Sequence, residues 1–95
     1  MHAAVRKYRV SDVDALVEKV ESEFVEQVKS VDGFVGYYVI DGGDGTATSI
    51  TVGETEDAVE QSTSRAAEWV ADSVADLIEG APEVSSGEVR VRAER

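Results

Sequence analysis

Cysteine is absent from the sequence and histidine occurs once, as His2, which together exclude most thiol and metal chemistry. Without cysteine there is no disulfide, no thiolate nucleophile, no zinc–thiolate site and no iron–sulfur cluster. A metal site built on imidazoles is impossible within one chain, whereas carboxylates remain available to hard cations. We therefore expect neither a metal site nor a cofactor.

Long hydrophobic runs are absent as well. No apolar stretch approaches the roughly 18 residues of a membrane-spanning helix, and the N-terminus lacks the pattern of a signal peptide. These absences predict a cytoplasmic protein that makes no membrane contact.

Basic residues are scarce: nine lysines and arginines face 20 aspartates and glutamates, which gives a formal net charge of −11. Such a surface repels nucleic acids and anionic membranes. Solubility alone needs a net charge of magnitude about 2–8 in a small domain. The acid excess with only three lysines resembles the composition of proteins from salt-accumulating archaea, so we expect a halophilic archaeal source.

The chain of 95 residues is long enough for one domain, which we place at residues 1–95. A chain this short buries only about 60–70% of its extended surface, so a second subunit would stabilise it.

Two stretches have the apolar periodicity of amphipathic helices. The first follows Ser11–Asp14, which fits a capping box, and ends at Gly33. The second is Thr55–Ile78, whose first residue caps the helix and which the Gly80–Pro82 segment terminates. The apolar positions are Val13, Val17, Val20, Phe24, Val28 and Val31 in the first helix, and Val59, Ala66, Val70, Val74 and Leu77 in the second.

Four stretches have the composition of β-strands. They are Ala3–Val10, Phe34–Asp41, Ala47–Val52 and Glu88–Ala93. We expect a glycine-rich hairpin turn at Asp41–Gly45 and a loop at Glu79–Gly87. The resulting order βαββαβ predicts an α+β, ferredoxin-like fold with both helices on one face of the sheet and the first and last strands side by side.

The stretch Phe34–Asp41 is apolar on both of its faces. One face carries Phe34, Tyr38 and Ile40, and the other carries Val35, Tyr37 and Val39. A single layer of helices covers only one face of a sheet. We therefore expect a symmetric homodimer that buries the face without helices.

Six of the nine basic residues fall on or beside the first and last strands. Such a strip could hold an anionic ligand, or its charges could pair with Glu88, with Glu94 or with acids of a partner subunit, and we favour the pairing. The six are Arg6, Lys7, Arg9, Arg90, Arg92 and Arg95.

The only tryptophan, Trp69, lies beside the apolar stripe of the second helix, on a flank that it shares with Arg65 and several small side chains. An indole among small side chains either fills a gap in the core or forms one wall of a pocket. We favour core packing, because buried aromatic residues ordinarily belong to the core.

Three short motifs and the order of elements resemble the antibiotic-biosynthesis-monooxygenase-like (ABM-like) family. The motifs are VDGF at Val31–Phe34, AAEW at Ala66–Trp69 and GEV at Gly87–Val89. The resemblance covers almost the whole chain. It implies a dimeric α+β barrel, in which two sheets pack face to face, and a pocket between helices and sheet with a helix tryptophan at the position of Trp69.

In that family, members that oxidise polycyclic quinols without a cofactor rely on an asparagine, and members that degrade haem also use a helix histidine. This sequence has no asparagine, and its histidine lies outside the helices, so both residue sets are incomplete. The resemblance still implies an aromatic ligand pocket. Its candidate residues are Phe24, Tyr37 or Tyr38, and Trp69, with Tyr8 and Arg65 at the edge.

Two functions are compatible with these residues. The first is a cofactor-independent monooxygenase or related oxidoreductase that acts on an aromatic or quinone-like small molecule. The second is a non-catalytic dimeric domain that binds a small apolar ligand or has a regulatory role. Either function needs a cavity of roughly a few hundred Å³ beside Trp69.

Overall fold

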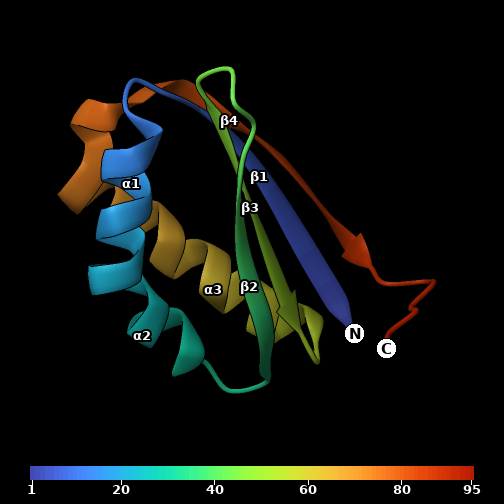
Figure 1. The fold of residues 1–95 in the computed structure, drawn as a ribbon. Coiled ribbons are helices and arrows are strands. Elements are labelled where there is room, and N and C mark those ends of the chain that lie inside the picture. The colour runs from blue at the N-terminus through green and yellow to red at the C-terminus, as the bar shows by residue number, and fades with distance from the viewer.

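Four antiparallel strands form one sheet in the computed structural model, which describes residues 1–95, and all helices lie against one face of that sheet (Figure 1). The strands are β1 (His2–Val10), β2 (Phe34–Asp41), β3 (Thr46–Gly53) and β4 (Ile78–Glu88). Their order across the sheet is β2-β3-β1-β4, so the first and last strands are neighbours as expected. The predicted α+β, ferredoxin-like βαββαβ fold is confirmed.

The first helical segment is continuous from Val13 to Lys29 but changes its winding in the middle. It consists of α1 (Val13–Lys19), the π-helical turn η1 (Val20–Phe24) and α2 (Val25–Lys29). Its N-cap is Asp12, whose side chain accepts a hydrogen bond from the backbone N–H of Ala15, so the cap lies one residue later than a box beginning at Ser11. Gly33 follows with φ of +84°, a conformation that favours glycine.

The second helical segment consists of α3 (Glu56–Trp69), the π-helical turn η2 (Val70–Val74) and the short 3₁₀ turn η3 (Ala75–Leu77). Thr55 is its N-cap, as predicted, because its hydroxyl accepts the backbone N–H of Ala58. The helix ends at Leu77 and the chain enters β4 at once. The Gly80–Pro82 segment therefore does not terminate the helix but lies within the following strand.

The predicted loop at Glu79–Gly87 and the predicted strand at Glu88–Ala93 are both wrong. Residues 78–88 form β4, which pairs with β1 from His2↔Glu88 to Val10↔Ile78. The sequence of β4 is polar and therefore lacks the apolar pattern of a strand. A polar sequence can still form an exposed edge strand, because such a strand is held mainly by backbone hydrogen bonds and tolerates proline. Residues 89–95 lie beyond β4, so the expected basic strip on adjacent strands does not form.

An irregularity in β4 creates space beside Tyr8. Lys7 pairs with Glu83 and Arg9 with Glu79, so the single residue of β1 between these pairs, Tyr8, faces three residues of β4. The two extra residues come from the Gly80–Pro82 segment, which bulges away from β1. Gly80 has φ of +75°, as such a bulge requires.

A second irregularity changes which side chains of β2 reach the core. The register shifts by one residue between Phe34↔Gly53 and Gly36↔Val52. This bulge puts Phe34 on the same face as Tyr37 and Val39, and all three pack against the core. The expected grouping of Phe34 with Tyr38 and Ile40 is therefore wrong, because simple alternation does not hold across a bulge.

The core lies between the helices and the sheet. Its buried members come from both helical segments and from β1 and β3: Tyr8, Val10, Leu16, Val20, Phe24, Val28, Ala47, Trp69 and Val74. The opposite face of the sheet carries no helix (Figure 1). On this face Val5 of β1 pairs with Ile50 of β3, and Ile50 pairs with Tyr38 of β2. Tyr38 is 60% exposed.

Phe24 is the largest fully buried side chain, so we predict that Phe24→Ala lowers the free energy of unfolding by about 3–5 kcal/mol. Phe24→Leu leaves a smaller cavity and should lower it clearly less. Chemical denaturation followed by circular dichroism measures both values. A loss below about 1 kcal/mol for Phe24→Ala would contradict this account of the core.

Candidate functional site

Three aromatic rings connect the two helical segments to the sheet. Trp69 ends α3 and is only 8% exposed. Its ring lies 5.3 Å from that of Phe24, and Phe24 in turn meets Tyr37 of β2 edge to face at 5.5 Å. These distances are typical of stabilising aromatic pairs. Trp69 is thus both a core residue, as favoured from the sequence, and part of a cavity wall.

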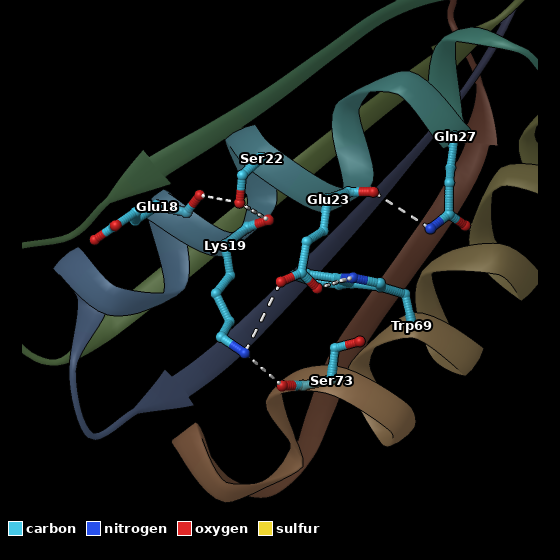
Figure 2. A network of polar contacts seen from close by, with 7 residues as sticks. All are labelled: Glu18, Lys19, Ser22, Glu23, Gln27, Trp69 and Ser73. Carbon is cyan, nitrogen blue, oxygen red and sulfur yellow. Dashed lines mark hydrogen bonds and ion pairs between the residues drawn. The ribbon is translucent and has the colours of Figure 1, made fainter.

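The indole of Trp69 is held in orientation by a polar contact at its edge (Figure 2). Its N–H donates to Oε1 of Glu23 at 3.3 Å, and the other carboxylate oxygen lies 3.9 Å from Nζ of Lys19. Lys19 also donates to the backbone carbonyl of Ser73 at 3.4 Å. Figure 2 shows Glu23 between Lys19 and Trp69, so this network ties η1 to the α3–η2 segment.

A small, partly open cavity lies beside Trp69, and we call it the Trp69 cavity. Its volume is about 30 Å³, which holds one or two waters but no aromatic ring. Its lining is hydrophobic apart from Ser49. The lining residues are Tyr8, Leu16, Val20, Phe24, Tyr37, Val39, Ala47, Ser49, Ala66, Trp69, Val70 and Ile78.

A larger open groove adjoins this cavity, and we call it the Arg6 groove. It has a volume of about 350 Å³, within the range of small-molecule sites. It shares Tyr8, Val70 and Ile78 with the Trp69 cavity, so these three side chains form the partition between the two spaces. The remaining lining residues are Arg6, Ala67, Ala71, Ala75, Gly80 and Pro82.

Arg6 is buried in one wall of the groove, with only 8% of its surface exposed. Its Nη1 donates to the backbone carbonyl of Thr63 at 3.0 Å, and its guanidinium carbon lies 5.4 Å from the centre of the Tyr8 ring. Nε is buried and has no hydrogen-bond partner. The alternation of β1 could have revealed this residue from the sequence, because Ala4, Arg6, Tyr8 and Val10 share the buried face.

Burial keeps two tyrosine hydroxyls of the Trp69 cavity in the neutral form. It raises the pKa of Tyr37 to about 12, with a smaller contribution from the charge of Tyr8 and an opposing effect of Arg6. Burial also raises the pKa of Tyr8, and the positive charge of Arg6 offsets this only in part. At neutral pH both hydroxyls are therefore hydrogen-bond donors and neither is a base.

Four of the six site residues proposed from the sequence line the Trp69 cavity: Tyr8, Phe24, Tyr37 and Trp69. Tyr38 does not, because neighbouring residues of a strand point to opposite faces, and it lies on the face without helices. Arg65 is exposed and its Nη1 lies 3.5 Å from the hydroxyl of Ser30, at the end of α2. Its side chain thus bridges the two helical segments outside the cavity.

No group of three or more histidine, aspartate or glutamate side chains is arranged to hold a metal ion. No helix is long and apolar enough to cross a membrane.

Comparison with solved structures gives full-length matches to oxygenases of this architecture. A monooxygenase from the gene ActVA-Orf6 of Streptomyces coelicolor, solved with nanaomycin D, matches with a TM-score of 0.78 and 21% identity over 99% of this chain and 91% of that chain. SnoaB, a cofactor-independent oxygenase from Streptomyces nogalater, matches with a TM-score of 0.75 and 18% identity over 99% and 97%.

A dimeric ferredoxin-like protein from an uncultured marine organism matches with a TM-score of 0.75 and 6% identity over 99% of this chain and 98% of that chain. A protein of unknown function from Nitrosomonas europaea is also among the matches. No protein-family model matches the chain, and a search of curated protein sequences finds no match. The resemblance to the ABM-like monooxygenases is therefore confirmed as a likeness of fold over nearly the full length.

We predict that stability falls as the pH rises from about 10 to 12, in part because of Tyr37. Its pKa in the folded state is about 12 against about 10 in the unfolded chain, so the unfolded state loses the proton first and is favoured in that window. The free energy of unfolding of the protein should fall by about 2–3 kcal/mol more across this window than that of Tyr37→Phe. Denaturation curves at several alkaline pH values measure the difference, and parallel pH profiles would contradict the assignment.

Proposed function

We propose that the protein is a cofactor-independent monooxygenase, or a closely related oxidoreductase, that acts on an aromatic, quinol-like small molecule. The observation that carries the proposal is a pair of adjoining spaces: a mainly apolar groove of about 350 Å³, and an aromatic cavity of about 30 Å³ beside Trp69. Tyr8, Val70 and Ile78 line both spaces. The full-length likeness to two oxygenases supports the choice of reaction class.

The substrate's ring system occupies the Arg6 groove, and its reactive edge reaches the partition formed by Tyr8, Val70 and Ile78. The substrate supplies all the electrons for the reduction of dioxygen. One oxygen atom is inserted at a ring carbon. The other leaves as water with the single hydrogen of that carbon and the hydrogen of a ring hydroxyl, so that a phenol ring becomes a quinone. Tyr8, which lines the groove, contributes as a neutral donor to the substrate's oxygens.

A second candidate function is favoured by two observations. The Trp69 cavity is too small for a ring, and its two tyrosine hydroxyls are not bases at neutral pH. A protein with these features can bind an aromatic ligand in the groove without turning it over. A non-catalytic ligand-binding or regulatory domain is therefore the alternative to the enzyme.

We further propose that the protein is a homodimer whose subunits join through the face of the sheet without helices. This face exposes Val5, Val35, Tyr38 and Ile40, whose exposed fractions range from 37% to 60%. An apolar patch of neighbouring strands is a surface that monomers rarely leave uncovered. The similar marine protein is dimeric and ferredoxin-like, which supports a dimer for this chain as well.

Dimerisation predicts a mass in solution of twice the 10.2 kDa of one chain. Size-exclusion chromatography with light scattering measures it. Tyr38→Glu places a charge in the patch and should give a folded monomer, whereas Arg65→Gln, on the helical side of the molecule, should leave the dimer intact. A monomeric protein at micromolar concentration would contradict the proposal.

Binding and turnover are tested together with a naphthoquinone and the corresponding quinol. Because Trp69 is the only tryptophan, we predict saturable quenching of its fluorescence by the quinone. Tyr8→Phe should weaken binding by roughly three- to tenfold, the effect of one hydrogen bond, and Tyr38→Phe should not. Oxygen uptake with the quinol, above its rate without protein, separates the two candidate functions.

Saturable binding with protein-dependent oxygen uptake supports the monooxygenase, and the same binding without uptake supports the ligand-binding domain. Quenching that does not saturate, together with no added oxygen uptake, would overturn both.

A further inference from the structure

Arg6 is a buried cation whose charge has no counterpart in the protein. Its contacts are one backbone carbonyl, that of Thr63, and the face of the Tyr8 ring. It takes part in no ion pair, and its Nε lacks any hydrogen-bond partner. Buried guanidinium groups are normally paired with an anion, because desolvation of an uncompensated charge is unfavourable.

The neighbouring basic residues of β1 differ from Arg6 in this respect. Lys7 and Arg9 are exposed, and their partners in β4 are the acidic residues Glu83 and Glu79. The partner of Arg6 in β4 is Val84, and its partner in β3 is Ser49. In a chain with 20 acidic residues, the one buried arginine thus has only neutral residues opposite it.

The groove beside this cation is otherwise apolar. Arg6 is its only charged lining residue, and Tyr8 is the only other one with a polar side-chain group. Small residues of the α3–η3 segment form the opposite wall: Ala67, Ala71 and Ala75. A space of about 350 Å³ with one positive wall fits a molecule with an apolar body and a single anionic group.

We propose that Arg6 binds an ionised oxygen of the ligand, so that the natural ligand is an acidic aromatic compound, which carries a phenolate or a carboxylate. The ligand's oxygen takes the place of the missing counterion. Because Nε is covered in the free protein, the guanidinium turns toward the groove when the ligand binds. This inference rests on the proposed function for the aromatic body of the ligand. The anionic group of the ligand is inferred separately, from Arg6 itself.

The test uses four matched probes: unsubstituted naphthoquinone, a naphthoquinone carboxylic acid, a hydroxynaphthoquinone whose hydroxyl is ionised at neutral pH, and the methyl ether of the latter. Quenching of Trp69 fluorescence, checked by calorimetry, gives the affinities. We expect at least one ionised probe to bind roughly tenfold or more tightly than its neutral counterpart. Preference for the carboxylate or for the phenolate identifies which oxygen the site takes.

Arg6→Met keeps the length and apolar packing of the side chain but removes its charge. It should abolish the preference for the ionised probe, a loss of roughly ten- to hundredfold, and leave the affinity for the neutral probe within about twofold. Arg6→Lys should retain part of the preference. Arg65→Gln is the control, because that arginine lies outside both spaces.

Equal affinity of the protein for ionised and neutral probes would overturn the anion site and leave the proposed function standing. Equal weakening of both probe types by Arg6→Met would also overturn it, since that pattern indicates a purely structural role. Absence of binding by every probe would overturn the proposed function and the inference together. The comparison of the hydroxyquinone with its methyl ether needs no variant, so the outcome stands even if Arg6→Met does not fold.

Discussion

The contact between Phe24 and Trp69 is the interaction on which the rest of the structure depends. It joins the two helical segments at a ring separation of 5.3 Å, and the edge of Tyr37 fixes both to the sheet. Each ring adjoins a π-helical turn: Phe24 ends η1, and Trp69 precedes η2. Such turns are frequent at functional sites because they redirect side chains within a helix. The same three rings therefore hold the fold together and form one side of the cavity.

Local sequence rules predicted most of the fold. The N-cap at Thr55, the strand Phe34–Asp41 and the order of elements follow from capping, alternation and periodicity, which act over a few residues. Strand β4 could not be predicted in the same way, because its polar sequence has no alternation and its partners in β1 lie 68 to 86 residues away along the chain. The bulges in β2 and β4 are likewise set by pairing between strands.

The candidate pocket was predicted from the resemblance to the ABM-like family, which implies a helix tryptophan at the position of Trp69. Trp69, Phe24, Tyr8 and one of two adjacent tyrosines followed from the sequence, but the choice between Tyr37 and Tyr38 needed the observed register. From the sequence, Arg6 was predicted only as one member of a basic strip. Arginine is seldom buried, but the alternation of β1 places Arg6 on the buried face. The groove beside Arg6 is lined by Gly80 and Pro82 of the bulge in β4, and this bulge depends on the pairing of β4 with β1.

The central claim is that a ligand occupies the Arg6 groove and meets the partition next to Trp69. A crystal structure of the protein with a hydroxynaphthoquinone tests it most directly. The account predicts electron density for the ring between α3 and β1, with an oxygen within hydrogen-bond distance of Arg6 and with Tyr8 in contact. Density only on the face without helices, or a ring fully inside an expanded Trp69 cavity with Arg6 unmoved, would contradict it.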